Sequence, residues 1–296
     1  MNIQHSLKQL KHWVYLLRWN KPSGRLILLI PAGWSLWLTP SAPPSKNLVS
    51  LIVAGAIFTS GAGCIINDLW DINIDKKVQR TKTRPLTSGK VKRITALILL
   101  IATLSLSCLV VFLLPVSSRV LCLKLAFIAL GAILIYPSSK RWCKFPQVLL
   151  AICWGFSVLI PWSASESSLN GGWPLLSCWI GTMIWTFGFD TVYAMADQKD
   201  DKKIGLNSSA LNLGGKALTI VSISYGLTSL LLGLAAFTSG ISFVYWPIWS
   251  IFTLGMQREV ALLKNFDFRM SRFSRHFQNQ VLLGSLILLG LILGKS

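Results

Sequence analysis

The acidic residues of this chain gather in two short stretches. Only 10 of its 296 residues are Asp or Glu, and most of them fall in residues 67–75, NDLWDINID, and residues 190–201, DTVYAMADQKDD. The acids in these stretches are Asp68, Asp71, Asp75, Asp190, Asp197, Asp200 and Asp201. Each stretch lies at the end of a long apolar run, so the pattern predicts several carboxylates where a membrane-spanning helix ends. Carboxylates this close repel one another and call for a bound cation.

The spacing of the first stretch predicts a polar face. If the preceding helix continues, Asn67, Asp71 and Asp75 recur every four residues and project to one side. Asp68 lies beside them. An amide and three carboxylates would then face the same aqueous boundary.

The second stretch repeats this arrangement. Asp197 and Asp201 stand seven and eleven residues after Asp190, and Tyr193 lies three residues after it, so all four share one helical face. An acid-poor chain that places the same spacing at the ends of two apolar runs indicates a site rather than two solvated helix ends.

Oxygen ligands of this kind suit magnesium. The ion keeps several waters and binds through one or two carboxylates plus substrate phosphates, so two such stretches could hold two ions bridged by a diphosphate. Basic residues lie nearby: Arg80, Lys82, Arg84, Lys140, Arg141, Lys144, Lys202 and Lys203. Metal and cations together would neutralise a diphosphate leaving group and favour breakage of its carbon–oxygen bond.

The composition is that of an integral membrane protein. Hydrophobic residues make up 53% of the chain and charged residues only 13%, and the mean hydropathy is +0.58. The net charge of +19 would suggest nucleic acid in a soluble protein, but here the charges must be interpreted by their position relative to the spans, and no nucleic-acid partner is expected. The six cysteines are scattered without CxxC pairs, which predicts small buried residues rather than disulfides or a zinc site.

Nine apolar segments predict an all-α membrane fold in one domain spanning residues 1–296. The segments are 22–38, 48–66, 94–115, 120–136, 146–162, 173–196, 217–239, 241–256 and 281–294. The eighth and ninth are shorter than the ~20 residues that a bilayer requires. No cleaved signal peptide is expected, because the first 25 residues are basic and amphipathic.

The basic residues predict the orientation. With sides alternating from the N-terminus, 25 of the 29 Lys and Arg fall on the N-terminal side. The positive-inside rule therefore places the N-terminus and both acidic stretches in the cytoplasm, with residues 71–93 and 197–216 as loops that cap the site. With nine spans the C-terminus leaves on the opposite side.

These motifs resemble those of a known family. The pattern comprises Asn67-Asp68-x-x-Asp71-x-x-x-Asp75, Arg80-Thr81-x-x-Arg84-Pro85-Leu86-x-Ser88-Gly89, and Asp190-Thr191-x-Tyr193-Ala194-Met195-x-Asp197-x-x-Asp200-Asp201. It is similar to the two signatures of the UbiA superfamily of intramembrane prenyltransferases, specifically the 4-hydroxybenzoate polyprenyltransferases. Lys21-Pro22-Ser23-Gly24, Tyr136-Pro137-x-x-Lys140-Arg141 and Phe277-x-Asn279 extend the resemblance over most of the chain.

The resemblance implies nine helices around a cavity that opens sideways to lipid, in the inner membrane of a bacterium. It implies magnesium-assisted ionisation of a polyprenyl diphosphate and attack by the ring of 4-hydroxybenzoate, an early step towards a quinone such as ubiquinone or plastoquinone. The implied metal and diphosphate ligands are Asn67, Asp71, Asp75, Asp197 and Asp201. Phosphate contacts would come from Arg80, Arg84, Lys140 and Arg141, and the aromatic acceptor would lie beside Asp190 and Tyr193. Asp68 would orient ligands.

Several alternatives remain open at this point. Arg25 stands where relatives often carry an apolar residue, and it either meets an acceptor carboxylate or extends to the headgroups. The same fold could take another acceptor, such as homogentisate, a naphthoate, a chlorophyllide or haem, because a metal motif does not specify the ring. A transporter of an organic phosphate or metal ion is a rival from another class. The acids lie at one boundary only, which favours an enzyme.

Overall fold

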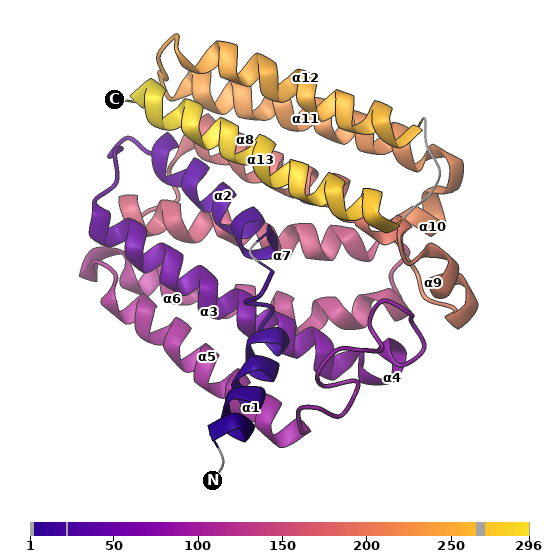
Figure 1. Cartoon of the computed structure of the whole chain (residues 1–296). Helices are drawn as coiled ribbons and strands as arrows, with labels where there is room; N and C mark the ends of the chain where they lie inside the picture. Colours follow the sequence, from indigo (N-terminus) through magenta and orange to yellow (C-terminus); the bar gives the residue numbers. More distant parts are fainter. Residues whose placement is uncertain (1–2, 22, 265–269, 296) are drawn as a thin grey trace.

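The fold is a bundle of long helices (Figure 1). The computed structural model describes residues 3–21, 23–264 and 270–295, and all regular secondary structure in that part is helical. The long helices are α2 (Ser23–Leu38), α3 (Lys46–Trp70), α5 (Arg93–Leu113), α6 (Val116–Ile135), α7 (Pro146–Glu166), α8 (Gly172–Met195), α11 (Ala217–Thr238), α12 (Tyr245–Lys264) and α13 (Met270–Lys295). Shorter elements are α1 (Ile3–Leu16), α4 (Ile72–Asp75), α9 (Gln198–Ile204), α10 (Ser209–Leu213) and the 3₁₀ turns η1 (Tyr136–Arg141) and η2 (Gly214–Lys216).

Seven helices within the described ranges are long and apolar enough to cross a membrane. They are α3, α5, α6 with its 3₁₀ extension, α7, α8, α11 with the turns before it, and α13. The integral membrane fold is thereby confirmed, whereas nine spans remain a prediction. Of the other two predicted spans, α2 has 16 residues, and its expected start, Pro22, lies outside the described residues. Helix α12 carries Arg258, Glu259 and Lys264 near its end.

The predicted segment 241–256 corresponds to α12, which begins four residues later for a local reason. Gly240 ends α11 with a positive φ of 66°, and the N–H of Ile241 donates to the carbonyl of Ala236 at 3.0 Å. This is the glycine-terminated helix end in which a left-handed residue closes the last turn. Residues 241–244 therefore form the connection, and α12 begins at Tyr245 and continues to Lys264.

Helix α8 lies at the centre of the larger half of the bundle. It packs against α7, α11, α13 and α2, while α3 packs chiefly against α5. Trp34 of α2 and Trp185 of α8 are fully buried together, with ring centroids 5.0 Å apart. Both indoles are hydrogen-bonded to α13: Trp34 donates to the carbonyl of Gly284 at 3.0 Å and Trp185 to Gln280 Oε1 at 2.8 Å. Helix α13 is thus fixed to α2 and α8.

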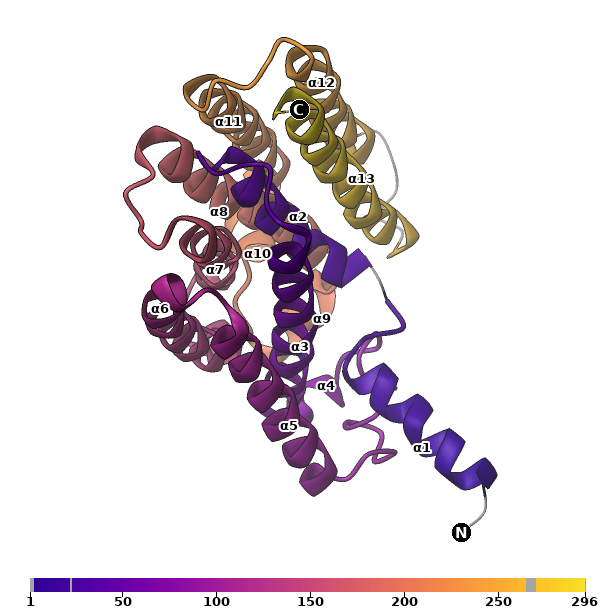
Figure 2. The ribbon, with the colours of Figure 1, turned by 90° about the vertical axis from the view of Figure 1, so that its left-hand side faces the viewer.

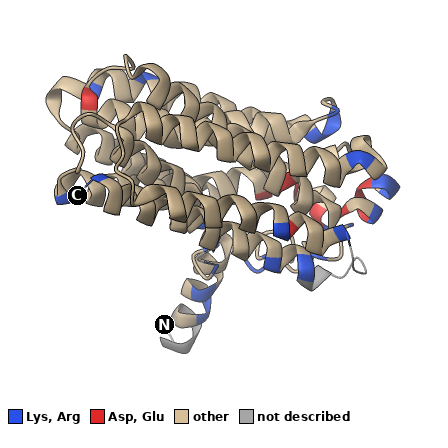
Figure 3. Ribbon diagram, turned by 90° about the horizontal axis from the view of Figure 1, so that it is seen from above, with Lys and Arg blue, Asp and Glu red and all other residues tan. Residues whose placement is uncertain are grey.

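Charged residues concentrate at one end of the bundle. The short elements α4, α9 and α10 lie there, opposite the C-terminus (Figure 1), and both acidic stretches and many Lys and Arg residues lie at the same end (Figure 3). Helix α1 runs across the direction of the long helices and projects from the bundle (Figure 2). The two acidic stretches, 115 or more residues apart in the chain, are therefore brought to one pole of the molecule.

Candidate active site

A cavity of about 1440 Å³ runs through the bundle beside α3. Its deeper part is apolar, with walls that include Leu51, Ile52, Val111, Leu130 and Ile160. Its polar end is lined by the predicted site residues Asn67, Arg80, Arg84, Lys140, Asp190, Tyr193, Asp197 and Asp201. Asp68, Asp71, Asp75 and Arg141 stand behind that lining and act on it through ion pairs. The cavity joins a charged head compartment to a long apolar one.

The first acidic stretch contains a bend between two helices. Helix α3 ends at Trp70, and Asp71 adopts φ −98° and ψ 9° before the single turn of α4. The backbone spacing nevertheless survives: the N–H of Asp71 donates to the carbonyl of Asn67 at 3.0 Å, and that of Asp75 to the carbonyl of Asp71 at 2.7 Å. Helix α3 thus does not continue through the whole stretch, but the four-residue hydrogen-bond register on which the predicted polar face depends is kept through the bend.

Arg84 joins two of the buried carboxylates. Its Nη1 lies 2.6 Å from Asp75 Oδ2 and 3.1 Å from Asp68 Oδ1. Asp68 is only 1% exposed, and it also accepts a hydrogen bond of 2.6 Å from Arg18. Since an unpaired buried charge is strongly destabilising, Arg84 and Arg18 together make the burial of Asp68 tolerable.

Asp71 is held by the 3₁₀ turn that follows α6. Lys140 Nζ lies 3.3 Å from its Oδ2, and Arg141 Nη2 lies 3.2 Å from its Oδ1. Arg141 also donates to the carbonyl of Trp70 at 3.1 Å. The turn therefore docks onto the end of α3, and Lys140 itself lines the cavity.

The second stretch is held by Arg80. Helix α8 ends at Met195, and Asp197 is the residue immediately before α9. The prediction that Asp190, Tyr193, Asp197 and Asp201 share one helical face is therefore wrong, because the chain changes helix between Tyr193 and Asp201. Arg80 binds both carboxylate oxygens of Asp197, with Nε 2.9 Å from Oδ1. Its Nη1 donates to the hydroxyl of Tyr193 at 2.9 Å, and its guanidinium lies 5.0 Å from the centroid of that ring. The loop after α4 is thereby tied to α8.

Two further carboxylates face the cavity without an ion pair among the described residues. They are Asp190 and Asp201, both in the lining of the polar end. Burial raises the pKa of Asp201 to about 6, and the nearby Asp197 raises it further, while Lys140 and Arg80 oppose the shift. Burial also raises the pKa of Asp75, against the effect of Arg84. A raised carboxyl pKa means that burial of the charged form is only partly compensated, and a bound cation would add compensation.

The donor set fits a hard divalent cation, but it is not assembled as a metal cage. Within the described residues no three His, Cys, Asp or Glu side chains are grouped as ligands. The side chains of Asp71, Asp75 and Asp197 are instead neutralised by Lys or Arg. Every candidate ligand is an oxygen donor, which is the chemistry that magnesium requires. Metal binding would need the basic side chains to move from carboxylate to phosphate.

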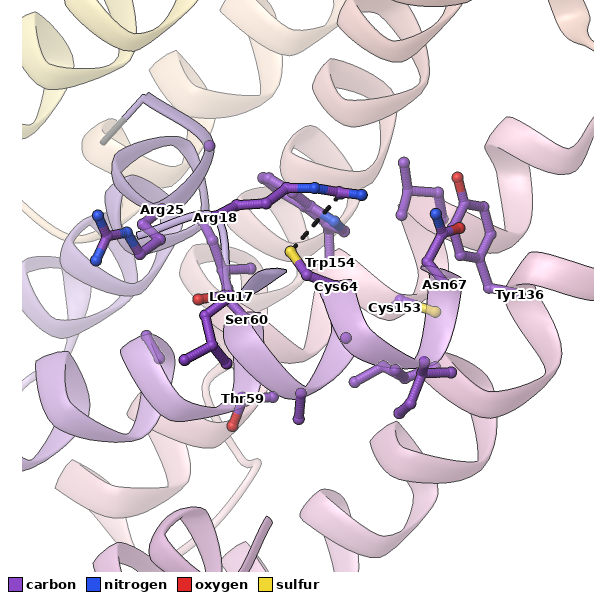
Figure 4. A pocket seen from close by; sticks show the side chains of 18 of the residues that line it. Leu17, Arg18, Arg25, Thr59, Ser60, Cys64, Asn67, Tyr136, Cys153 and Trp154 are labelled. Atoms are coloured by element: carbon purple, nitrogen blue, oxygen red, sulfur yellow. Dashed lines mark hydrogen bonds between the residues drawn. The ribbon is translucent and has the colours of Figure 1, made fainter. Parts of the chain in front are cut away.

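Sequence reasoning missed Arg18. It lines the cavity, with its guanidinium beside Cys64 (Figure 4). The same guanidinium donates to Asp68. Its backbone φ is 55°, an uncommon value for a residue with a side chain. Arg25, which sequence reasoning did select, also lines the cavity but extends away from Arg18 (Figure 4) and binds the carbonyl of Trp19. The only sequence signal for Arg18 is its place just before the Lys21 motif.

Gln147 is a second residue that sequence reasoning left out of the site. It lines the cavity, and its Oε1 accepts a hydrogen bond of 2.8 Å from the N–H of Ser209. Tyr136, from the end of α6, lines the same region. Neither residue belongs to the charged spacing from which the site was predicted. The motifs Tyr136-Pro137-x-x-Lys140-Arg141 and Pro146-Gln147, which belong to the family resemblance, were the sequence signal for them.

This all-helical membrane bundle, with acids and guanidinium groups at the head of an apolar cavity, has the architecture of an intramembrane enzyme that acts on an anionic lipid-like substrate. Comparison with known proteins identifies it further. Residues 28–281 match the model of the UbiA prenyltransferase family, and the chain belongs to that family.

Its relatives align over nearly their whole length. The chain is 39% identical over 283 residues to the 4-hydroxybenzoate solanesyltransferase of Synechocystis sp., covering 95% of this chain and 94% of that protein. It is 32% identical over 288 residues to the 4-hydroxybenzoate octaprenyltransferase of Blochmanniella pennsylvanica, covering 96% of each.

Solved structures share the fold. The apo structure of a UbiA homologue from Aeropyrum pernix K1 matches with a TM-score of 0.76 at 24% identity, over 90% of this chain and 97% of that one. A UbiA homologue from Archaeoglobus fulgidus bound to GPP and Mg²⁺ matches with a TM-score of 0.65 at 17% identity, over 93% of this chain and 99% of that one.

Proposed function

We propose that this protein transfers a polyprenyl group from a polyprenyl diphosphate to the ring of 4-hydroxybenzoate, releasing diphosphate, as an early step of quinone biosynthesis. The observation that carries the proposal is the single cavity with a charged head and a long apolar body. Such a shape suits a molecule with an anionic diphosphate at one end and a hydrocarbon chain at the other. Relatives named as 4-hydroxybenzoate polyprenyltransferases support the acceptor.

The charged head would bind the diphosphate by exchange of partners. Magnesium, when bound, would neutralise the departing diphosphate. Its ligands would be Asn67, Asp71, Asp75, Asp197 and Asp201. Arg80 and Arg84, which pair with these carboxylates in the substrate-free protein, would instead contact phosphate oxygens, and Lys140 and Arg141, the partners of Asp71, would do the same. The chain's own cations then stabilise the charge that develops as the carbon–oxygen bond breaks.

The acceptor would lie deeper, beside Asp190 and Tyr193. These two side chains line the cavity from the last two turns of α8, and Asp197 follows the end of that helix. The apolar wall beyond them would hold the prenyl chain and keep water from the reactive carbon. This order, with phosphate outermost and ring within, follows from the position of the guanidinium groups at the polar end.

We further propose the orientation of the site. The charged pole would face the cytoplasm, with α2 and α12 completing nine spans in a bacterial inner membrane. The concentration of Lys and Arg at that pole supports this orientation. Part of the predicted cytoplasmic stretch 257–280, residues 265–269, lies outside the described residues.

One assay tests the activity. Membranes containing the protein are incubated with radiolabelled 4-hydroxybenzoate and a long-chain prenyl diphosphate, with magnesium or with a chelator. We expect a lipid-soluble labelled product only with magnesium, and none from the Asp197→Asn variant. Parallel reactions with homogentisate and a naphthoate test the other acceptors. Product from one of these and none from 4-hydroxybenzoate would reject the proposed acceptor, and no product from any would reject the enzyme in favour of a transporter.

A further inference from the structure

A buried polar network lies outside the cavity and joins the last three long helices. Tyr225 of α11 and His276 of α13 meet through the Tyr hydroxyl and Nε2 at 2.7 Å. His276 Nδ1 lies 3.2 Å from Glu259 Oε2 of α12, and Asn279 Nδ2 donates to Glu259 Oε1 at 2.8 Å. His276 is 2% exposed and Glu259 8%. A satisfied buried network of this kind fixes the positions of the helices that contribute to it.

The network holds a segment of α13 that also forms part of the cavity wall. Consecutive helical residues point about 100° apart, so Phe277 faces a different side from His276. Phe277 lines the cavity. Its ring centroid lies 5.7 Å from that of Phe189 and 5.7 Å from that of Tyr193. The anchored residue and the wall residue are therefore neighbours in the chain.

Tyr225 also sets how closely α11 approaches α8. A Cβ added to Gly188 would lie 2.7 Å from a ring carbon of Tyr225, so the ring packs directly on the glycine backbone. Gly188 precedes Phe189 and Asp190, both of which line the cavity. The ring of Tyr225 thus supports α8 at the same level at which its hydroxyl holds α13.

We propose that Tyr225, His276 and Glu259 form a positioning network that holds Phe277 against Phe189 and Tyr193 and thereby sets the fit of the aromatic acceptor. None of the three touches the cavity in the described part of the chain. The hydroxyl of Tyr225, together with His276 and Glu259, acts on the acceptor through Phe277. The acceptor part of this inference rests on the proposed transfer to an aromatic acid.

A pair of matched variants isolates the network. Tyr225→Phe removes the hydroxyl that meets His276. Tyr245→Phe removes a hydroxyl that donates to the carbonyl of Leu232 at 3.3 Å, a contact between α12 and α11 that lies away from the cavity. Both tyrosines are 0% exposed, so the two changes are alike in size and burial. A difference between the effects of the two variants would therefore show that the location of the lost hydroxyl matters, and not a general loss of packing.

The kinetic test varies each substrate in turn. We expect Tyr225→Phe to raise KM for 4-hydroxybenzoate by about three- to tenfold, as the loss of one buried hydrogen bond allows, with KM for the prenyl diphosphate unchanged. Tyr245→Phe is expected to leave both KM values unchanged. The positioning role is rejected if the two variants change KM for the aromatic acid equally. It is also rejected if Tyr225→Phe changes only KM for the prenyl diphosphate.

A double variant tests whether the effect passes through Phe277. If it does, adding Tyr225→Phe to Phe277→Leu raises KM for the aromatic acid no further than Phe277→Leu alone. If the two substitutions instead multiply each other's effect on KM for the aromatic acid, the network acts by another route and the inference is overturned.

A measurement without substrate separates this inference from the proposed function. Hydrogen–deuterium exchange of the peptide containing Phe277 is compared in wild type, Tyr225→Phe and Tyr245→Phe. We expect faster exchange in the first variant alone, because the α13 turn loses its anchor. Equal exchange in all three would reject the network. Failure of the proposed function would show instead as a wild-type protein that does not prenylate 4-hydroxybenzoate, whatever the exchange result.

Discussion

Arg80 and Asp197 are 117 residues apart in the chain and form a two-pronged ion pair at the head of the cavity. Both oxygens of the carboxylate are engaged. A carboxylate held in this way is already neutralised by its partner. We therefore expect binding of metal and substrate at this site to exchange one set of charge pairs for another.

The first prediction is that magnesium and diphosphate bind cooperatively. Diphosphate would draw Arg80 and Arg84 away from their carboxylates and so free the metal ligands. We expect inorganic diphosphate to tighten magnesium binding by at least about fivefold, the lower end of typical coupling between two ligands. Isothermal titration of magnesium with and without diphosphate measures this, corrected for their association in solution. Equal magnesium affinities would show that the ion pairs need not open.

The second prediction concerns the acids. Asp71→Asn, Asp75→Asn, Asp197→Asn and Asp201→Asn are each expected to remove most of the activity, because an amide keeps the shape but not the charge that anchors the metal. Asp200→Asn is the matched control. Its carboxylate accepts only the N–H of Gln79, at 3.3 Å, among the described residues, and little loss is expected. Near wild-type turnover in any two of the four variants would rule out the two-stretch metal site.

The third prediction concerns Arg84. Arg84→Ala is expected to lower kcat and weaken binding of the prenyl diphosphate, because its guanidinium acts on charge that develops as the bond breaks. KM for the aromatic acid is expected to stay unchanged in this variant. Arg84→Ala also leaves Asp68 and Asp75 without a shared partner, so thermal unfolding must be recorded beside the kinetics. A variant that lost affinity only for the aromatic acid would reverse the assigned ends of the cavity.

The fourth prediction concerns Tyr193. Sequence reasoning predicts that Tyr193→Phe chiefly changes KM for the aromatic acid. The structure adds that the hydroxyl accepts a hydrogen bond of 2.9 Å from Arg80, so the variant is also expected to weaken diphosphate binding, by about two- to tenfold. The Arg80→Lys variant is the comparison, since lysine keeps the positive charge but cannot form the two parallel hydrogen bonds of a guanidinium group. An effect of Tyr193→Phe on the aromatic acid alone would mean that this hydrogen bond opens before the diphosphate binds.

The fifth prediction concerns topology. Reporters fused at Ser88 or Lys203, both exposed at the charged pole, are expected to give a cytoplasmic signal, and those at Ser45 or Asn170 an external one. Lys203 is a better position than Ser208, whose side chain is 2% exposed and accepts the N–H of Leu211 at the start of α10. An external signal at Ser88 would place the site on the other side of the membrane.

Sequence periodicity predicted the helices well because a bilayer imposes one length and one composition on every span. The predicted segment 217–239 corresponds to the observed helix Ala217–Thr238, and the predicted segment 173–196 to the observed helix Gly172–Met195. The predicted helix boundaries were wrong where a left-handed glycine ends a helix, as at Gly240. They were also wrong where polar residues continue a helix beyond its apolar part, as at Lys264.

The contents of the site were predictable from the sequence, but the pairing within it was not. Helical spacing selects Asp71 and Asp197, yet no periodicity connects Asp71 to Lys140 or Asp197 to Arg80, because those contacts depend on how distant loops fold over the pole. Arg18 escaped notice for the same reason. Its ion pair with Asp68 joins residues 50 positions apart.

The bridge that Arg84 makes between Asp68 and Asp75 has a practical consequence. Because Arg84 already neutralises Asp68 and Asp75, the substrate-free protein is expected to hold this part of its structure without metal. It is expected to survive extraction and storage in a chelating buffer, and magnesium alone is expected to move its melting temperature little. The ion then arrives with each diphosphate and leaves with it, so turnover in a cell would follow the concentration of magnesium-bound substrate rather than that of a preloaded enzyme.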